Sequence, residues 1–348
     1  MYVQDMENNV FALDRSTGEV RWSTMYGVPT EGPNGIAVAY GRVFGGLGDS
    51  GDAFALDAET GEEFWRVNLT NNAGEGIDMA PTVYDNVVYI STVPGSEEEF
   101  YEGGQRGILY ALDAETGETL WSFDTTAGEP TGNLWGNPRI NSGGGLWSPL
   151  SVDDDGNIYF GVGNPAPWPG TEAWPNATSR PGPNNYTNSM VSLDPETGAI
   201  RWFHNARPHD LFDLDHHLTP ILVEATYGDT TTRLAIGGGK TGTVTAADRD
   251  TGHLVWETQV GIHQNDTVTH IPEGRTLRVY PGALGGVETP MAYANGTVFV
   301  PVVNLWSEYS STSFQGLQNL ADGTGELVAL DAATGEVQWS VDLPVINV

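Results

Sequence analysis

The sequence predicts an all-β protein, a β-propeller made of four-stranded antiparallel blades. One short phrase returns six times along the 348 residues, and alternating apolar and polar runs lie between the copies. No segment shows convincing helical periodicity. Repeats spaced by tens of residues are typical of stacked or circular arrays in which each copy belongs to one unit. We therefore expect a single propeller domain over residues 1–348, with about six blades.

The repeated phrase predicts a β-hairpin. It reads Ala-Leu-Asp-Arg-Ser-Thr-Gly-Glu-Val-Arg-Trp at 12–22, with close copies at 55–65, 111–121 and 329–339 and looser copies ending at Trp202 and Trp256. Alternating residues form the first strand, Asp-x-x-Thr-Gly forms the turn, and the Trp belongs to the second strand. The large indole is expected to pack against a neighbouring unit. Runs such as 35–47 and 81–91 are expected to supply the other two strands.

The composition excludes some classes of protein. Acidic residues outnumber basic ones 46 to 14, which gives a net charge of −32 and disfavours nucleic-acid binding. With 39% apolar residues and 11 Trp, the chain is not expected to be disordered. Acidic residues spread throughout the chain suggest a halophilic source, because concentrated salt screens self-repulsion.

Targeting and redox signals are few. The chain has no cysteine, so disulfides, thiolate metal sites and covalently attached haem are not expected. No apolar run approaches the length of a membrane span, and no signal peptide opens the sequence. Five Asn-x-Ser/Thr sequons support export only weakly, because such triplets also arise by chance.

Residues 202–217 are the densest cluster of chemically useful side chains. The stretch holds Asp210, Asp213 and Asp215 together with four of the seven histidines. Pro208 ends the strand that Trp202 begins, so a loop follows. In a loop, Asp213 and Asp215 can converge on one hard cation. The alternative interpretation is a solvated acidic loop in a very acidic protein.

Lys240 is the only lysine in the chain, and it lies in Gly-Gly-Gly-Lys-Thr-Gly. Its retention in a composition that otherwise uses Arg suggests a specific role. The segment differs from a phosphate-binding loop, because Leu234 occupies the place of the first required Gly.

The repeat and the segments between its copies resemble one known family. The phrase matches the tryptophan-docking motif of the pyrroloquinoline quinone (PQQ) propellers. Gly-Asn-Pro-Ala-Pro-Trp at 163–168 and Pro-His-Asp-Leu-Phe-Asp at 208–213 are similar to segments of the methanol-dehydrogenase type of PQQ-dependent alcohol dehydrogenase. The resemblance covers nearly the whole chain. The family ring has eight blades, so six phrases imply either an incomplete ring, in which residues 343–348 would still pair with the first strands, or a smaller closed ring.

The resemblance implies a metal site and a cofactor site. The implied metal ligands for Ca²⁺ or a lanthanide ion are Glu102, Asn164, Asp213 and Asp215, with Glu97, Glu98 and Glu99 as rivals of Glu102. Asn164 alone could also be an ordinary turn residue before Pro. The implied PQQ contacts are Trp147 as the floor under the ring, Lys240 in place of a basic residue at the quinone oxygen, and Asn304. Asp213 is the implied catalytic base, with Lys240 assisting.

The function implied by this resemblance is oxidation of a small alcohol by metal-bound PQQ outside the cytoplasm, either extracellular or at the cell surface, including a space equivalent to the periplasm. A separate cytochrome or blue-copper protein would accept the electrons. Two features depart from the family pattern: the adjacent-cysteine disulfide is absent, and Gly32-Pro-Asn-Gly-Ile lacks an expected Arg. The alternative is a noncatalytic PQQ-like propeller that acts as an exported binding or assembly scaffold.

Overall fold

The computed structural model describes residues 1–30, 32–71, 74–94, 105–126, 135–315 and 317–344. It confirms the all-β prediction, with six blade-like antiparallel sheets in chain order. The first has three strands and the other five have four.

The strands of the six blades are as follows. The first three blades contain β1 (Tyr2–Gln4), β2 (Val10–Leu13) and β3 (Val20–Thr24); β4 (Ile36–Ala39), β5 (Arg42–Leu47), β6 (Asp52–Asp57) and β7 (Glu63–Asn68); and β9 (Thr82–Tyr84), β10 (Val87–Ser91), β12 (Ile108–Asp113) and β13 (Thr119–Asp124). The last three contain β15 (Ser151–Val152), β16 (Ile158–Gly161), β18 (Ser189–Leu193) and β19 (Ile200–Asn205); β20 (Ile221–Tyr227), β21 (Thr230–Gly237), β22 (Thr243–Asp248) and β23 (Leu254–Gln259); and β25 (Ala292–Ala294), β26 (Thr297–Asn304), β29 (Thr324–Asp331) and β30 (Val337–Leu343).

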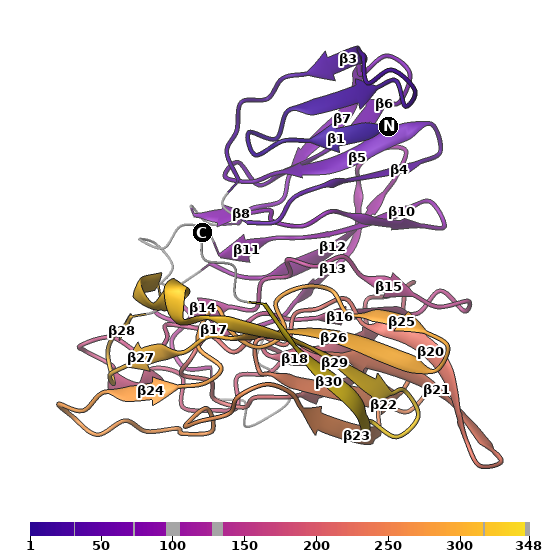
Figure 1. Cartoon of the computed structure of the whole chain (residues 1–348). Coiled ribbons are helices and arrows are strands. Elements are labelled where there is room, and N and C mark those ends of the chain that lie inside the picture. Colours follow the sequence, from indigo (N-terminus) through magenta and orange to yellow (C-terminus); the bar gives the residue numbers. More distant parts are fainter. Residues whose placement is uncertain (31, 72–73, 95–104, 127–134, 316, 345–348) are drawn as a thin grey trace.

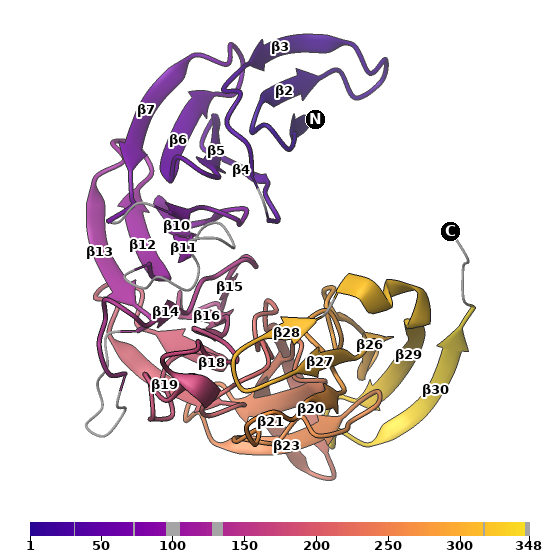
Figure 2. The same ribbon diagram turned by 90° about the vertical axis from the view of Figure 1, so that its left-hand side faces the viewer.

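The blades follow one another around an arc, with the β1–β3 sheet at one end and β30 at the other (Figure 2). The expected pairing of the last residues with the first strands is not found in the described part of the chain. There Leu343 pairs with Gly325 of β29, and β1 pairs with β2. Residues 345–348 lie outside the described residues. The arc is therefore not closed into a smaller ring by strand pairing between the described residues at its two ends.

Each repeated phrase forms the hairpin of the two outer strands of a blade. In the second blade, Asp57 Oδ1 accepts hydrogen bonds from the backbone N–H of Glu59 (2.8 Å) and of Thr60 (2.8 Å). The Thr60 hydroxyl donates to the same oxygen at 3.1 Å, and Gly61 closes the turn with a φ of +76°. The Asp and Thr side chains thus satisfy the turn backbone, and the left-handed position selects Gly.

The phrase tryptophans join neighbouring blades. Each of the first five donates its indole N–H to a backbone carbonyl in the next blade's turn: Trp22 to Ala58 (3.1 Å), Trp65 to Ala114 (3.2 Å), Trp121 to Pro195 (2.8 Å), Trp202 to Arg249 (2.9 Å) and Trp256 to Ala332 (3.0 Å). The same rings lie against the glycine of that turn, as Trp65 does against Gly117. The sixth, Trp339, is 44% exposed. One contact is therefore repeated at every junction within the arc.

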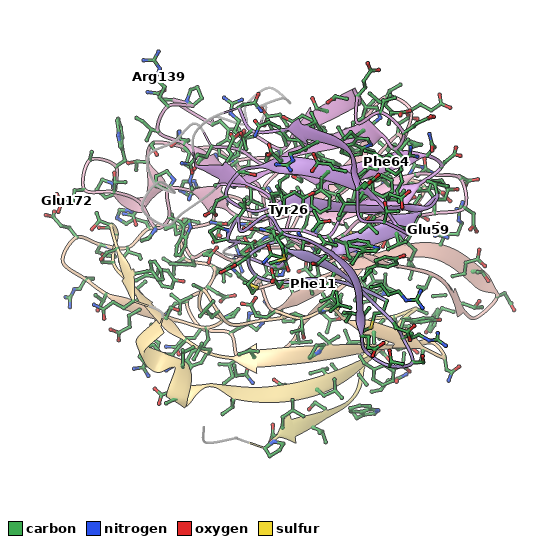
Figure 3. All side chains as sticks on the ribbon, turned by 90° about the horizontal axis from the view of Figure 1, so that it is seen from above. Phe11, Tyr26, Glu59, Phe64, Arg139 and Glu172 are labelled. Carbon is green, nitrogen blue, oxygen red and sulfur yellow. The ribbon has the colours of Figure 1, made fainter. Side chains whose placement is uncertain are left out.

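The longer segments between blade strands gather on one side of the molecule. Three small sheets lie there, on the left of Figure 1: β8 (Glu75–Gly76) with β11 (Val93–Pro94), β14 (Ser142–Gly143) with β17 (Pro165–Ala166), and β24 (Leu277–Val279) with β27 (Ser307–Tyr309) and β28 (Phe314–Gln315). Two 3-10 helices complete the secondary structure of the described residues, η1 (Pro175–Ala177) and η2 (Leu317–Asp322). Arg139 and Glu172 lie at the outer edge of this side (Figure 3).

The loop side has its own apolar core, distinct from the cores between blades. Its centre includes Trp168, Leu211, Phe212, Leu214 and Tyr309. These residues come from loops far apart in sequence, so their burial fixes the loops relative to one another. Among the described residues, no helix is long and apolar enough to cross a membrane.

A matched pair of glycine substitutions tests the repeated junction. Gly117→Ala is expected to lower the free energy of unfolding by about 1–2 kcal/mol for the left-handed φ and by about 1–3 kcal/mol for overpacking. Its new Cβ would lie 2.8 Å from the Trp65 ring. Gly18→Ala has the same φ of +76° but no heavy atom within 4 Å, so only the first cost applies. Denaturant unfolding measures both, and equal losses would contradict the packing role of the indole.

The turn aspartates predict acid sensitivity. Backbone hydrogen bonds from the turns hold the pKa of Asp57 and of Asp113 below the usual value. Because the folded pKa is depressed, this stabilisation is present above the unfolded pKa near 4 and is lost as the pH falls through the folded pKa. Thermal unfolding in concentrated salt, measured from pH 6 downward, should show a falling Tm. Asp113→Asn should show a shallower fall than the wild type, and an unchanged slope would contradict the assignment.

Candidate active site

The acidic stretch is a buried loop between β19 and β20. Asp210 organises it, because its two carboxylate oxygens accept the backbone N–H of Phe212 (2.9 Å) and of Leu214 (2.7 Å). Leu211, Phe212 and Leu214 enter the apolar core of the loop side. Asp213 and Asp215 alternate with these apolar residues and do not belong to that core. They are nevertheless only 8% and 0% exposed. The interpretation as a solvated acidic loop is therefore wrong.

Lys240 lies between these two carboxylates. Its Nζ is 2.9 Å from Asp213 Oδ2 and 2.9 Å from Asp215 Oδ2, and the lysine is 4% exposed. The loop that carries it must approach the acidic loop closely. A Cβ on Gly239 would meet the backbone oxygen of Asp215 at 2.2 Å, which explains the glycine before the lysine. Lys240 precedes β22, so a strand follows it and not the helix of a phosphate-binding loop.

Trp147 and Asn164 complete the cluster. Lys240 Nζ lies 4.6 Å from the centre of the Trp147 ring, within the range of a cation–π contact. The backbone N–H of Asn164 donates to Asp215 Oδ1 at 2.5 Å. The Asn164 side chain donates its Nδ2 to Pro165 O at 3.2 Å, so its amide oxygen is the end left to act as a ligand. Five of the predicted site residues thus come together from separate loops.

Burial dominates the protonation behaviour of the cluster. It raises the pKa of Asp213 well above its usual range, although the charge of Lys240 opposes this and Asp215 adds to it. Burial also raises the pKa of Asp215, against the charge of Lys240. For Lys240, burial alone would lower the pKa, but the charges of Asp213 and Asp215 outweigh it and raise the pKa. The lysine therefore stays protonated at neutral pH, and Asp213 is a far stronger base than an exposed aspartate.

The histidines of the stretch are neutral rather than charged. Burial lowers the pKa of His216 and of His217 to about 3. His216 Nε2 pairs with Thr245 Oγ1 at 3.0 Å, and the His217 ring lies 5.5 Å from Trp147, centre to centre. Neutral rings suit packing beside a buried ammonium, which would repel an imidazolium.

Glu288 is a site residue that the sequence analysis missed. Burial raises its pKa to about 7, with the Lys240 charge opposing and the Asp215 charge adding to the shift. Its segment lies directly on the lysine loop: Val287 N–H donates to Gly239 O at 3.0 Å. Glu288 Oε1 is buried without a hydrogen-bond partner among the described residues. Only the Gly285-Gly286 pair before it hints from sequence at such a close approach.

Two predicted residues do not join the cluster in the described structure. Glu102 and its rivals lie outside the described residues. Asn304 ends β26, where its Oδ1 accepts the Ile262 N–H at 2.8 Å and its Nδ2 donates to Glu326 at 3.1 Å. In the part of the chain that is described, no three His, Asp or Glu side chains are arranged to hold a metal ion. The roles of Glu102 and Asn304 stay predictions.

The charge balance of the cluster indicates what it can bind. Two buried carboxyl groups, of Asp213 and Asp215, and the half-buried carboxyl of Glu288 act on one ammonium, so ionised carboxyls leave excess negative charge. Buried charge needs compensation, and a hard cation on carboxylate and amide oxygens would supply it. The Trp147 face and Lys240 suit a flat ligand that carries an electron-rich oxygen. The residues present therefore fit a cation beside a planar anionic group.

Comparison with known proteins agrees with this geometry. Residues 1–270 match the profile of the PQQ family described as the glucose/ethanol/alcohol dehydrogenase β-propeller domain. The chain belongs to this PQQ β-propeller family. The quinoprotein ethanol dehydrogenase of Pseudomonas aeruginosa is 25% identical over 97% of this chain and 66% of its own length. The lanthanide-dependent methanol dehydrogenase of Methylacidiphilum fumariolicum is 26% identical over 88% of this chain and 57% of its own length.

Solved structures show the same PQQ-propeller fold. The quinohemoprotein alcohol dehydrogenase ADHIIG of Pseudomonas putida HK5 superimposes with a TM-score of 0.83 at 23% identity, covering 99% of this chain and 59% of that one. A europium-containing methanol dehydrogenase gives a TM-score of 0.80 at 24% identity, covering 98% of this chain and 69% of that one. The chain thus spans 57% to 69% of the length of these four PQQ-family relatives.

Removal of the shared cation tests the electrostatics of the cluster. Lys240→Met leaves two buried carboxyl groups without a counter-charge, and it should lower the free energy of unfolding by about 3–5 kcal/mol at neutral pH. Lys240→Arg retains the positive charge, so its free energy of unfolding should fall less than that of Lys240→Met. The loss should shrink in acid, because protonated carboxyls need no counter-charge. Denaturant unfolding at two pH values measures this, and a loss independent of pH would contradict the ion-pair role.

Proposed function

We propose that this chain is the propeller of a quinoprotein alcohol dehydrogenase. One observation carries the proposal: Lys240 Nζ lies 2.9 Å from Asp213, 2.9 Å from Asp215 and 4.6 Å from the Trp147 ring centre. Catalytic groups and an aromatic platform are thereby assembled from three separate loops. A noncatalytic scaffold has no need of such a buried charge cluster, and membership of the PQQ family supplies the cofactor class.

The residues divide into those that would hold cofactor and cation and those that would act on the substrate. Trp147 offers its face to the PQQ ring and Lys240 its charge, with Asn304 as a further contact. Asp213, Asp215 and Asn164, joined by Glu102, would hold Ca²⁺ or a lanthanide ion, since hard cations prefer such oxygen ligands. When bound, PQQ supplies the acceptor for the hydride that leaves the alcohol carbon, and the cation supplies Lewis acidity.

Asp213 is the proposed base for the alcohol hydroxyl. Its left-handed backbone conformation (φ +61°) and burial hold the carboxylate at the lysine, and its raised pKa makes it a stronger proton acceptor than an exposed aspartate. Lys240 would stabilise negative charge that develops on a neighbouring oxygen, without solvent reorganisation. Since Lys is a point charge, it cannot form the two-pronged contact of an Arg. Loss of the hydroxyl proton and a hydride converts the alcohol to an aldehyde.

The proposal extends to partners and location. A small alcohol would be the substrate, and a separate cytochrome or blue-copper protein would take the electrons. Such a pathway places the protein outside the cytoplasm, at the cell surface or beyond. The acidic surface is consistent with concentrated salt, which screens a net charge of −32.

Ligand titration in concentrated salt tests the site directly. The wild type is expected to bind PQQ with quenching of Trp fluorescence and a rise in Tm, and only when Ca²⁺ or La³⁺ is present. Asn164→Ala should weaken this binding by removing one ligand. Asp153→Asn provides the control, because Asp153 is buried but pairs with Asn157 and Tyr159 away from the cluster. Absence of PQQ binding by folded wild type with either ion would overturn the proposal.

Dye-linked alcohol oxidation separates the enzyme from a scaffold. The loaded wild type should reduce an artificial electron acceptor in the presence of a small alcohol. Asp213→Asn should lower kcat by about 10²–10⁴-fold, the range for loss of a general base. Retained PQQ binding without turnover in the wild type would favour the noncatalytic alternative.

A further inference from the structure

Arg180 is a buried arginine that the proposed chemistry does not use. It follows η1 on the loop side, and its side chain is 0% exposed. Burial lowers its pKa to about 9, with the charge of Asp210 opposing the shift, so it is protonated at neutral pH. A buried guanidinium is costly unless its N–H groups are paired. The hydrogen bonds of this side chain therefore indicate its role.

The guanidinium binds three segments at once. Its Nε and Nη2 donate to the backbone carbonyl of Pro167, at 3.2 and 2.9 Å. Nη2 also donates to the backbone carbonyl of Asp210 at 2.6 Å, and Nη1 donates to Asn184 Oδ1 at 2.8 Å. These acceptors are all neutral oxygens. The planar group acts as a fixed spacer between backbones that are distant in sequence.

Two of these segments carry the site. Pro167 lies three residues after Asn164, and Asp210 lies three residues before Asp213. In the described structure the Asp210 carboxylate forms no ion pair with the guanidinium, and its oxygens instead accept the N–H groups of Phe212 and Leu214. The chain Pro167–Arg180–Asp210 thus links the Asn164 loop to the turn that presents Asp213.

We propose that Arg180 is a positioning residue that sets the spacing between Asn164 and Asp213 and so shapes the cation and cofactor site. Asn164 and Asp215 meet through one hydrogen bond of 2.5 Å, so a shift of either loop would separate the ligands. A misplacement of about 1 Å can cost roughly 10²-fold in an active site. The functional part of this inference rests on the proposed function, whereas the linkage of the two loops does not.

Matched arginine variants in concentrated salt test the role. In Arg180→Met, PQQ affinity in the presence of La³⁺ should fall at least tenfold among folded molecules. In Arg180→Lys the PQQ affinity should fall less, because lysine retains the positive charge. It should still fall, because lysine cannot donate to both carbonyls with a planar fork. Arg249→Met is the control: Arg249 is 8% exposed and lies in a blade turn, where its carbonyl accepts the Trp202 indole. It should lower Tm while leaving the affinity of the folded protein within twofold of the wild type.

Asn184→Gly is a second test that leaves Arg180 in place, for the case in which the arginine variants do not fold. It removes one acceptor of Arg180, and glycine tolerates the φ of +54° found at this position. Its PQQ affinity should fall in the same direction as that of Arg180→Met. If the variants at 180 and 184 lower Tm but bind PQQ as tightly as the wild type, Arg180 has a structural role only and the inference is overturned.

The apo protein separates this inference from the proposed function. Asp213→Asn is combined with Arg180→Met and, separately, with Arg249→Met, and Tm is measured without PQQ or metal. If Arg180 and Asp213 are linked, the Tm shift of their double variant should differ from the sum of the two single shifts. The Tm shift of the double variant at Arg249 and Asp213 should equal the sum of its own two single shifts. If the wild type binds no PQQ, the proposed function fails but non-additivity still supports the linkage. Additive shifts in both pairs would overturn it.

Discussion

The contact on which the fold depends is the indole of each blade resting on the turn of the next. A blade alone has one sheet and cannot bury both of its faces, so its stability depends on its neighbours. The Trp ring covers the glycine of the following turn, and its N–H satisfies a carbonyl there. Because the turn and the Trp belong to the same phrase, each copy inside the arc both gives and receives this contact, whereas among the described residues the Gly18 turn of the first copy receives none and Trp339 of the last copy is exposed. The repeat therefore encodes the junction as well as the hairpin.

This arrangement leaves the connecting loops free to carry chemistry. The blades are held from their outer strands, so long insertions on one side do not disturb the repeat. Those insertions bury an apolar core of their own, with Phe212 and Tyr309 in edge contact at 4.8 Å between ring centres. A loop that is packed in this way can hold charged residues in place as firmly as a strand does. The acidic turn at Asp213 depends on this second core.

The buried charges of the cluster suit the binding of a ligand better than a contribution to folding stability. Burial of carboxyl groups costs free energy, and one ammonium does not balance three of them. Such an imbalance is retained where a ligand completes it, and perturbed pKa values gather at such places. Glu288 adds to the imbalance, since its raised pKa of about 7 reflects burial beside Asp215. Arg180 is the second buried cation of this region, and its bonds go to backbone carbonyls instead.

Much of this protein could be predicted from sequence because the information is local. The turn residues Asp, Thr and Gly act within a few positions of one another, so the phrase predicted each hairpin and its Trp. Asp213, Asp215 and Lys240 could be selected because they lie in segments of unusual composition, whereas Trp147 and Asn164 were selected because their segments resemble those of the PQQ family. Their meeting at one point could not be read from spacing, since it depends on how loops from different blades pack.

Other features were decided only by tertiary structure. Only the Gly285-Gly286 pair hints at Glu288, and the role of Arg180 could not be read from the sequence, because both roles arise from contacts with segments far away in the chain, Gly239 and Asp210 among them. Burial, which the sequence does not reveal, likewise raises the pKa of Asp213 well above its usual range. The sequence by itself thus determined the blades, whose contacts repeat between adjacent phrases. The tertiary structure decided the electrostatics of the site, because desolvation and distance are properties of the packed loops alone.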